Sequence, residues 1–429
     1  MEKLFINGGR KLSGVVRISG SKNAALAIMA GAILAEDVVT LYNVPRILDT
    51  QIMVELLNGL GASTRFVDRN TVTIDPRNIH CLEAPYELVS KMRASFSVLG
   101  PLLARFGFAR VPVPGGCDIG ARPVNFHIEG LKRLGASLHT EHGIYTAECN
   151  SLHGNSIYFD FQSAGATQHL MTAATLAEGD TTIDNCATEP EVVDLANFLN
   201  SLGADIQGAG TTTIRISGKK RLHGGEYSII PDRMEAGTFA IIAAITRSDL
   251  KLQNAVYSHM KPMISKIVEA GAEVTEDFNG LRVRCNGRLN GINIKTMPHP
   301  GFPTDMHQPI AALLSIANGT SVITENVYES RFRYVNELNR MGANIKVEGR
   351  TAVITGVERL TGAPVTATDL RAGASLICAA LAAEGETEIA GIEHIDRGYE
   401  NYVGKLAELG ASICRGSEES WEGLKVCSL

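Results

Sequence analysis

The chain has 429 residues, of which 45% are hydrophobic and 20% charged, with a formal net charge of −6. This length predicts two domains or a repeat array of globular type. The mildly acidic charge, with no basic run, disfavours nucleic acid and anionic membranes as partners. No stretch resembles a signal peptide or is long enough to span a bilayer, so we expect a cytoplasmic protein.

The cysteines indicate neither a metal site nor a disulfide framework. There are eight, they are widely scattered, and no two form a CxxC pair. Free thiols in a reducing compartment are the simplest interpretation. No other group of residues has the spacing of metal ligands, and we expect no cofactor.

The first predicted element is a strand at Leu4-Phe5-Ile6, and six similar units follow it. Each unit has a helix that ends in a Gly-Ala pair, with the glycines 68 to 74 residues apart, at positions 61, 135, 203, 271, 342 and 410. Glycine after a helix closes its last turn in a left-handed conformation. After each pair come two short alternating segments, which are typical of a strand pair. Repetition at a fixed period indicates a duplicated structural unit.

A second set of helices precedes these, one in each unit. They are so rich in Ala, Leu and Ile that both faces must be buried, and we place them at 24–35, 94–105, 167–177, 237–246, 307–317 and 372–383. A β-branched segment follows each one. The unit is therefore strand–helix–strand–helix–strand–strand, repeated six times, and parallel strands joined through helices should dominate. The fold class is α/β.

Six units of this size suit two globular domains of three units each. The strand at Leu4-Phe5-Ile6 has no partner in the first unit, so we expect it to join the last units. A boundary near Ile229–Pro231 separates units three and four. The predicted domains are 22–229, and 1–21 together with 230–429.

A glycine-rich loop from Val111 to Pro123 places one thiol, Cys117, between Gly115-Gly116 and Gly120, with Arg122 close behind. Such a thiol should be partly exposed beside a positive charge, which favours reactivity. A mobile surface loop with an incidental cysteine explains the loop alone equally well.

Cations gather where the predicted helices begin. A cation at a helix N-terminus faces the positive end of the helix dipole, so its placement needs a reason. A shared anion is one reason, since guanidinium groups and backbone N–H groups bind phosphate and carboxylate together. Pairing with a neighbouring acid is the alternative for any single residue. The cations are Lys22, Arg93, Arg122, Arg233, Arg331, Arg371 and Arg397.

Several segments closely resemble the UDP-N-acetylglucosamine 1-carboxyvinyltransferases, a family of enolpyruvyl transferases. The resemblance covers essentially the whole chain, in order and with matching spacing. The segments are Ser21-Lys22-Asn23, Gly115–Pro123, Pro231–Phe239, Gly301–Met306, Glu329–Phe332, Asp369–Ala372 and Asp396–Tyr399. The resemblance implies two inside-out α/β domains, each of three βαβαββ units, with the active site in the cleft between them.

The implied reaction transfers the enolpyruvyl group of phosphoenolpyruvate to the 3-hydroxyl of UDP-N-acetylglucosamine and releases phosphate. This addition–elimination passes through a tetrahedral intermediate and is the first committed step of peptidoglycan synthesis, hence of cell-wall biogenesis, cell shape and division. By similarity Cys117 protonates C3 and can form a covalent pyruvate adduct, and Asp305 is the base on the sugar hydroxyl. Lys22, Arg122 and Arg397 resemble the phosphate clamp, with Arg331 and Arg371 toward the carboxylate.

The remaining substrate residues are also implied only by the resemblance. Asn23 and Arg93 match positions near both substrates, and the uridine side falls on Arg122, Pro123, Val124, Asn125, Phe126, Ser163, Ala164, Gly165 and Val327. Asn125, Ala164, Phe161-Gln162 and Leu48 depart from the commonest family pattern. They concern the nucleotide pocket or the rim of the cleft rather than the reacting centre.

Two other functions stay open. The sister enolpyruvyl transferases that act on shikimate 3-phosphate share the fold and the donor, but they lack the loop cysteine and the uridine segment. A duplicated relative that has become a regulatory or binding protein is disfavoured by the presence of Lys22, Cys117, Arg122, Asp305 and Arg397 together.

Overall fold

The fold comes from a computed structural model that describes residues 2–114 and 124–416. The chain divides into two compact units. Of the described residues, residues 20–114 and 124–230 belong to one, which we call the Lys22 unit, and residues 2–19 and 231–416 to the other, which we call the Asp305 unit. Each unit has its own hydrophobic core. None of the helices in the described ranges is long and apolar enough to cross a membrane.

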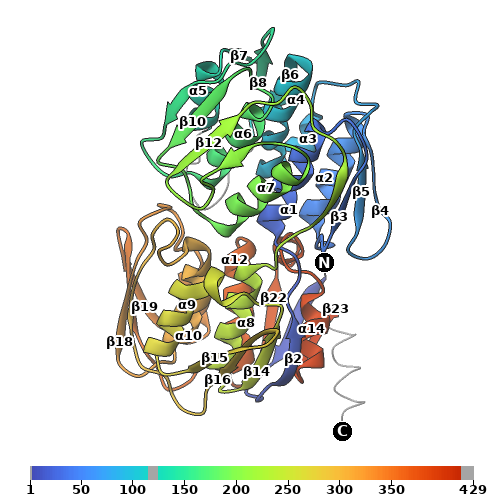
Figure 1. The fold of residues 1–429 in the computed structure, drawn as a ribbon. Coiled ribbons are helices and arrows are strands. Elements are labelled where there is room, and N and C mark those ends of the chain that lie inside the picture. Colours follow the sequence, from blue (N-terminus) through green and yellow to red (C-terminus); the bar gives the residue numbers. More distant parts are fainter. Residues whose placement is uncertain (1, 115–123, 417–429) are drawn as a thin grey trace. The chain divides into compact units, whose positions relative to one another are not determined.

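The Lys22 unit contains three sheets around a set of helices (Figure 1). The first sheet has, in the order of pairing, β13 (Gly225–Ser228), β3 (Val39–Tyr42), β5 (Val72–Asp75) and β4 (Ser63–Phe66). The second has β6 (Phe108–Pro112), β8 (Ile144–Glu148) and β7 (Ser137–Glu141). The third has β11 (Ile206–Gln207), β12 (Thr213–Ser217), β10 (Asp180–Asp184) and β9 (Ser156–Tyr158). The helices are α1 (Lys22–Gly31), α2 (Leu48–Gly59), α3 (Tyr86–Val89), α4 (Leu99–Phe106), α5 (Asn125–Arg133), α6 (Ala164–Ala174) and α7 (Pro190–Ser201), with the 3-10 turns η1 (Ala32–Leu34) and η2 (Arg93–Val98).

The Asp305 unit repeats this plan. Its first sheet has, in the order of pairing, β15 (Glu273–Asp277), β16 (Gly280–Arg284), β14 (Asp249–Gln253) and β2 (Ser13–Arg17). The second has β17 (Asn293–Lys295), β18 (Thr320–Thr324), β20 (Thr351–Thr355) and β19 (Asn344–Glu348). The third has β21 (Pro364–Thr366), β22 (Glu386–Ala390), β1 (Lys3–Asn7) and β23 (Ser412–Gly416). Its helices are α8 (Arg233–Ile245), α9 (Tyr257–Glu269), α10 (His307–Leu314), α11 (Tyr334–Arg340), α12 (Leu370–Ala382), α13 (Glu393–Asp396) and α14 (Tyr402–Glu408), with the 3-10 turn η3 (Thr304–Met306).

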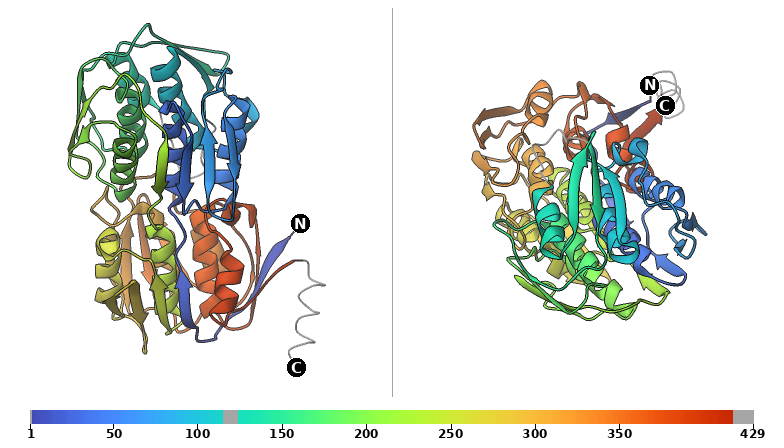
Figure 2. Two further views of the ribbon diagram at one scale, coloured as in Figure 1. Left: turned by 45° about the vertical axis from the view of Figure 1, so that its right-hand side comes forward. Right: turned by 90° about the horizontal axis from the view of Figure 1, so that it is seen from above.

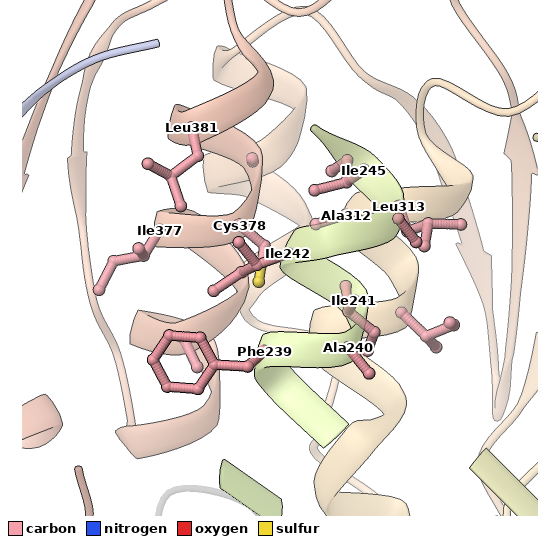
Figure 3. Packing of buried hydrophobic residues seen from close by; sticks show 14 of the residues in the cluster. Phe239, Ala240, Ile241, Ile242, Ile245, Ala312, Leu313, Ile377, Cys378 and Leu381 are labelled. Carbon is pink, nitrogen blue, oxygen red and sulfur yellow. The ribbon is translucent and has the colours of Figure 1, made fainter. Parts of the chain in front are cut away.

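The apolar helices form the interior of each unit, as their composition predicts. Every residue of α8 is buried, and α12 is buried along almost its whole length. Figure 3 shows Ile242 of α8 beside Cys378 of α12, with Leu313 of α10 on the other side of α8. Figure 2 shows the strands outside the helices in each unit, so the inside-out α/β prediction is confirmed.

The predicted predominance of parallel strands is wrong. Each four-stranded sheet of the described residues has one parallel pair and two antiparallel pairs. In three of these sheets the parallel pair joins the strands before and after a buried helix, namely β9 and β10, β17 and β18, and β21 and β22. The reason is local. A helical crossover produces one parallel pair, whereas the short turn after the second helix produces an antiparallel hairpin.

The N-terminal strands pair with the C-terminal half of the chain. β1 lies between β22 and β23, as the sequence predicts, and β2 pairs with β14 (Figure 1). In exchange, β13 from the middle of the chain pairs with β3 near its start. Strand β13 thus belongs to the Lys22 unit, whereas β1 and β2, which directly precede that unit in the sequence, belong to the Asp305 unit.

The six glycines after the second helices all adopt positive φ angles, between +92° and +110°. This confirms the predicted left-handed closure of each helix. Two helix starts differ from prediction. Helices α11 and α14 begin at Tyr334 and Tyr402, a few residues after Arg331 and Arg397, which were predicted to lie at these starts. Helix α9 begins at Tyr257 and contains Pro262.

Candidate active site

The predicted site residues divide between the two units. The Lys22 unit carries Lys22, Asn23, Arg93, Val124, Asn125, Phe126, Ser163, Ala164 and Gly165, and the Asp305 unit carries Asp305, Val327, Arg331, Arg371 and Arg397. Cys117, Arg122 and Pro123 lie outside the described residues.

Lys22 is the first residue of α1, where its backbone is held by the cap at Ser21. The Ser21 hydroxyl accepts a hydrogen bond from the backbone N–H of Ala24. The Lys22 ammonium lies 3.4 Å from the carboxylate of Asp49, which is buried in the first turn of α2. A cation at a helix start is unfavourable by itself, and Asp49 offsets part of that cost while fixing the side chain.

Two of the predicted nucleotide segments, residues 124–126 and 163–165, lie in the Lys22 unit at the starts of α5 and α6. Ser163 caps this helix by accepting from the backbone N–H of Ala166 at 3.3 Å. Phe126, in the first turn of α5, packs its ring against Phe159 at 5.6 Å between centroids, and this contact sets the direction of the α5 start. Val124 is buried, whereas Asn125 is exposed and its side chain is accessible to a ligand.

Asp305 lies between two buried arginines in the other unit. Its Oδ1 accepts from Arg331 Nη2 at 2.7 Å, and its Oδ2 accepts from Arg371 Nε at 3.1 Å. The side chains of Arg331 and Arg371 are only 2% and 5% exposed, while that of Asp305 is 27% exposed. The two guanidinium groups therefore hold a carboxylate that solvent or a ligand can still reach.

A hydrogen-bond chain fixes Arg371 from behind. Its Nη1 donates to the hydroxyl of Tyr399 at 2.9 Å, and this hydroxyl lies 2.9 Å from that of Thr238. Because the Thr238 hydroxyl donates to the backbone oxygen of Met234, the Tyr399 hydroxyl donates to Thr238. Burial favours the neutral form of Arg371, but Tyr399 and Asp305 outweigh burial and raise its pKa, so the guanidinium stays charged.

Glu325, at the end of strand β18, ties the rest of the site together. Its Oε2 accepts from the hydroxyl of Thr304 at 2.8 Å, and Thr304 in turn accepts from Arg331 Nη1 at 2.7 Å. Its Oε1 accepts from the backbone N–H groups of Val327 and Tyr328. One buried carboxylate thus orients both the Arg331 partner of Asp305 and the backbone of Val327.

His307 closes this network on its buried side. The His307 Nδ1 lies 3.0 Å from Glu325 Oε2, and its Nε2 lies 3.0 Å from the hydroxyl of Tyr334. Burial lowers the pKa of His307, so the ring is neutral, donates from Nδ1 and accepts from Tyr334. Burial alone would raise the pKa of Glu325, but its hydrogen bonds outweigh burial and hold it at about 2. Glu325 is therefore ionised.

Local pairing does not explain the buried arginines. Arg331 and Arg371 pair with the distant Asp305. Asp369 instead caps α12 through the backbone N–H groups of Arg371 and Ala372, and Glu329 pairs with Arg350. The prediction that these cations serve a common purpose is therefore the better explanation for this pair.

Arg397 does not occupy a helix start as predicted. It is the C-cap residue of the short helix α13, and α14 begins five residues later. A cation at a helix C-terminus is favourable, so the argument from the helix dipole does not apply here. The neighbouring Asp396 binds Arg415 with both of its oxygens.

No metal centre accompanies these groups in the described part of the chain. Within residues 2–114 and 124–416, no three His, Cys, Asp or Glu side chains are arranged to hold a metal ion. The chemistry present is that of a carboxylate acceptor set among fixed, permanently charged donors, which suits an anionic substrate with a hydroxyl to deprotonate.

Comparison with known proteins identifies the family. The family model described as EPSP synthase (3-phosphoshikimate 1-carboxyvinyltransferase) matches residues 6–406. UDP-N-acetylglucosamine 1-carboxyvinyltransferase 2 of Carboxydothermus hydrogenoformans is 54% identical over 97% of this chain and 100% of its own length. The enzyme of the same name from Gloeobacter violaceus is 52% identical over 96% of this chain and 90% of its own. The chain belongs to the UDP-N-acetylglucosamine 1-carboxyvinyltransferase family.

Solved structures agree on the fold of this carboxyvinyltransferase. The enolpyruvyl transferase NikO of Streptomyces tendae matches with a TM-score of 0.88 at 27% identity, over 96% of this chain and 98% of NikO. EPSP synthase of Acinetobacter baumannii matches with a TM-score of 0.77 at 20% identity, over 97% and 100% of the two chains. At that lower identity the likeness shows the fold alone. As a member of this family, the protein is a transferase.

The residues that sequence reasoning missed in this carboxyvinyltransferase are the supporting ones. Glu325, His307, Thr304, Tyr334 and Tyr399 were not assigned a role, although they hold the Asp305 cluster in place. The one signal for Glu325 was a charged residue directly after a β-branched strand. The burial of His307 follows from the apolar helix predicted at 307–317, but nothing in the sequence pairs this histidine with Glu325.

Replacing Glu325 with Gln should destabilise the enzyme. The amide is close in shape, but its NH₂ group would face N–H and O–H donors, which leaves buried donors without an acceptor. We expect the free energy of unfolding to fall by about 1–3 kcal/mol per donor left unsatisfied, measured by urea denaturation. Glu329→Gln is the matched control, because the Glu329 side chain is 68% exposed four residues away. Equal stability of the two variants would contradict the role given to Glu325.

Proposed function

We propose that this enzyme transfers the enolpyruvyl group of phosphoenolpyruvate to the 3-hydroxyl of UDP-N-acetylglucosamine and releases phosphate. The observation that carries the proposal is identity above 50% to enzymes of that name along almost the whole of both chains. The Asp305 cluster supports it, since a carboxylate fixed by two buried arginines is a suitable acceptor for a hydroxyl proton beside an anionic substrate.

The proposed chemistry is an addition followed by an elimination. Asp305 takes the proton of the sugar hydroxyl while the sugar oxygen bonds to C2 of phosphoenolpyruvate, and the Cys117 thiol gives a proton to C3. The tetrahedral intermediate then loses a proton from C3 and phosphate from C2, which restores the double bond. In a side reaction, Cys117 itself can add to C2 and form a covalent adduct.

The cations have two tasks in this proposal. Lys22, Arg122 and Arg397 bind the phosphate of the donor and stabilise charge as phosphate leaves. Arg331 and Arg371 serve the carboxylate of the donor, and their burial and fixed hydrogen bonds support this, because donors that do not reorganise stabilise charge most effectively. Asn23 and Arg93 contact both substrates.

The nucleotide side of the acceptor is assigned to residues 122–126, to Ser163, Ala164 and Gly165, and to Val327. Support comes from the ordering of this region by the Phe126–Phe159 contact and by the Ser163 cap, and from the hydrogen bond that holds the Val327 backbone to Glu325. We propose that each compact unit is one domain and that both contribute residues to the reaction.

The product of this reaction is a precursor of peptidoglycan, so we place the enzyme at the first committed step of cell-wall synthesis in the bacterial cytoplasm. The proposed partners are the two small-molecule substrates. We propose no nucleic acid, membrane or cofactor.

Phosphate release tests the acceptor. With phosphoenolpyruvate and UDP-N-acetylglucosamine, we expect continuous release of phosphate, and with shikimate 3-phosphate in its place, none above background. The reverse pattern would assign the enzyme to the sister activity named by the matching family model. No release with either acceptor would overturn both enzyme assignments.

A further inference from the structure

Two histidines in the Lys22 unit form a pair that the proposed reaction does not yet use. His169 of α6 is fully buried, and His127 of α5 is partly buried. Their Nδ1 atoms lie 2.9 Å apart, and the ring of Phe96 packs against both of them, with centroids 5.6 and 5.8 Å away. A hydrogen bond between two ring nitrogens needs one donor and one acceptor, so the pair has a defined proton arrangement.

The backbone of Gly100 determines that arrangement. Its N–H donates to His169 Nε2 at 2.6 Å, so this nitrogen carries no proton. Burial lowers the pKa of His169 to about 3, which keeps the ring neutral with its proton on Nδ1. His169 Nδ1 therefore donates to His127 Nδ1. Burial also lowers the pKa of His127 well below its usual value, so the single proton of His127 is on Nε2.

The Nε2 edge of His127 faces the start of α6. A Cβ atom built on Gly165 would lie 3.6 Å from His127 Cε1 and 3.7 Å from Nε2. Arg93 is close enough that its charge contributes to lowering the pKa of His127. Among the described residues, His127 Nε2 has no hydrogen-bond partner. The N–H donor of His127 thus lies beside Gly165 and close to Arg93, two residues assigned to the substrate on other grounds.

We infer that His127 donates its Nε2–H to a diphosphate oxygen of the sugar nucleotide, and that His169 is a positioning residue that fixes the required tautomer. The inference rests on the proposed function. A guanidinium, an imidazole N–H and the first N–H groups of α6 are all donors, so together they suit an anion. The diphosphate is the anionic part of UDP-N-acetylglucosamine.

Two substitutions of His127 separate substrate binding from packing. In His127→Asn the amide reaches only the Nδ1 position, so the contact with His169 can remain while the distal donor is lost. In His127→Gln the amide reaches the Nε2 position and restores a donor there. We expect His127→Asn to raise KM for UDP-N-acetylglucosamine about tenfold or more, with kcat within about twofold. His127→Gln should recover most of that loss.

Direct binding identifies the group contacted. By calorimetry, His127→Asn should weaken binding of UDP as much as it weakens binding of UDP-N-acetylglucosamine, and should leave KM for phosphoenolpyruvate unchanged. His153→Asn is the control, since this histidine lies in the same unit with a side chain 62% exposed, and its kinetics should match the unsubstituted enzyme.

A matched pair of substitutions tests the role of His169. His169→Leu and His169→Asn both remove the acceptor for the Gly100 N–H, so they should lose similar stability in thermal unfolding. Only Asn retains a donor near the Nδ1 position. We therefore expect a severalfold rise in KM for UDP-N-acetylglucosamine in His169→Leu, and a smaller rise in His169→Asn.

Three outcomes would overturn the inference while the enzyme still turns over UDP-N-acetylglucosamine. The first is an unchanged KM and UDP affinity in His127→Asn. The second is a rise confined to KM for phosphoenolpyruvate, which would assign the donor to that phosphate instead. The third is an equal rise in KM for UDP-N-acetylglucosamine in His169→Leu and His169→Asn, which would mean that KM depends only on the shared loss of stability. Failure of the unsubstituted enzyme to use UDP-N-acetylglucosamine would instead overturn the proposed function.

Discussion

Replacing Asp305 with Asn is expected to lower kcat by about 10²–10⁴-fold, the usual contribution of a positioned general base. The amide has nearly the same size and its oxygen can still accept from one of the two arginines, while its NH₂ group faces the other and the proton acceptor is lost. The measurement is steady-state phosphate release at saturating concentrations of both substrates. KM should change much less than kcat, because the lost interaction belongs to the transition state.

Asp249→Asn is a close control for that experiment. Asp249 also binds two arginines, Arg282 and Arg284, but all three side chains are solvent-exposed, on the inner strands β14 and β16. Its removal should leave kcat unchanged, since exposed ion pairs contribute little and this one lies outside the predicted site. A kcat of Asp305→Asn within about threefold of the unsubstituted enzyme would mean that another group accepts the proton.

Replacing Cys117 with Ser is the second large effect. A serine hydroxyl is a much weaker acid than a thiol, so protonation of C3 should slow, and we expect turnover to fall by about 10²-fold or more. The variant should also lose sensitivity to a phosphonate epoxide, which alkylates a thiolate and not a hydroxyl. Time-dependent inactivation, followed by mass spectrometry of the intact protein, measures this directly.

Cys117→Asp tests the reason for that loss. A carboxylic acid is another proton donor, so this variant should keep activity and yet resist the epoxide. Cys81→Ser is the control: Cys81 is a partly exposed free thiol outside the predicted site, and its loss should change neither property. The buried thiols are poor competitors, as burial raises the pKa of Cys186 to about 12. Full activity with retained sensitivity in Cys117→Ser would assign the reactive group elsewhere.

The repeat was the most predictable part of the fold. The second helix of each repeated unit is followed by a glycine, the residue that a left-handed closing turn favours, and all six glycines adopt that conformation. Uniformly apolar helices such as α8 could be placed in the interior because no polar face was available for solvent. These features depend on local chemistry, which the sequence records directly.

Strand direction and helix starts were less predictable, because they depend on contacts distant in sequence. Strand β2 joins the Asp305 unit because it pairs with β14, and β13 joins the Lys22 unit because it pairs with β3. Proline is common in the first turn of a helix, whereas α9 begins five residues before Pro262 and contains the proline in its interior. Tertiary packing outweighed the local preference at this position.

For the site, the resemblance supplied the residues proposed to contact substrate, and the physical argument from cations at helix starts pointed to several of them. The argument from helix starts wrongly included Arg397, which lies at the C-terminal end of α13. The supporting residues could not be predicted from the sequence. Helix α10 and strand β18 separate His307 from Glu325 along the chain, and only folding brings the two buried side chains together. His127 and His169 are a second example, with a tautomer set by the backbone of Gly100.

The identity of the product tests the central claim most directly. After incubation with phosphoenolpyruvate and UDP-N-acetylglucosamine, proton and carbon NMR of the purified nucleotide should show an enolpyruvyl ether on the 3-oxygen of the sugar, formed in equal amount to the phosphate released. An unmodified sugar nucleotide, or an ether on any other oxygen, would contradict the account.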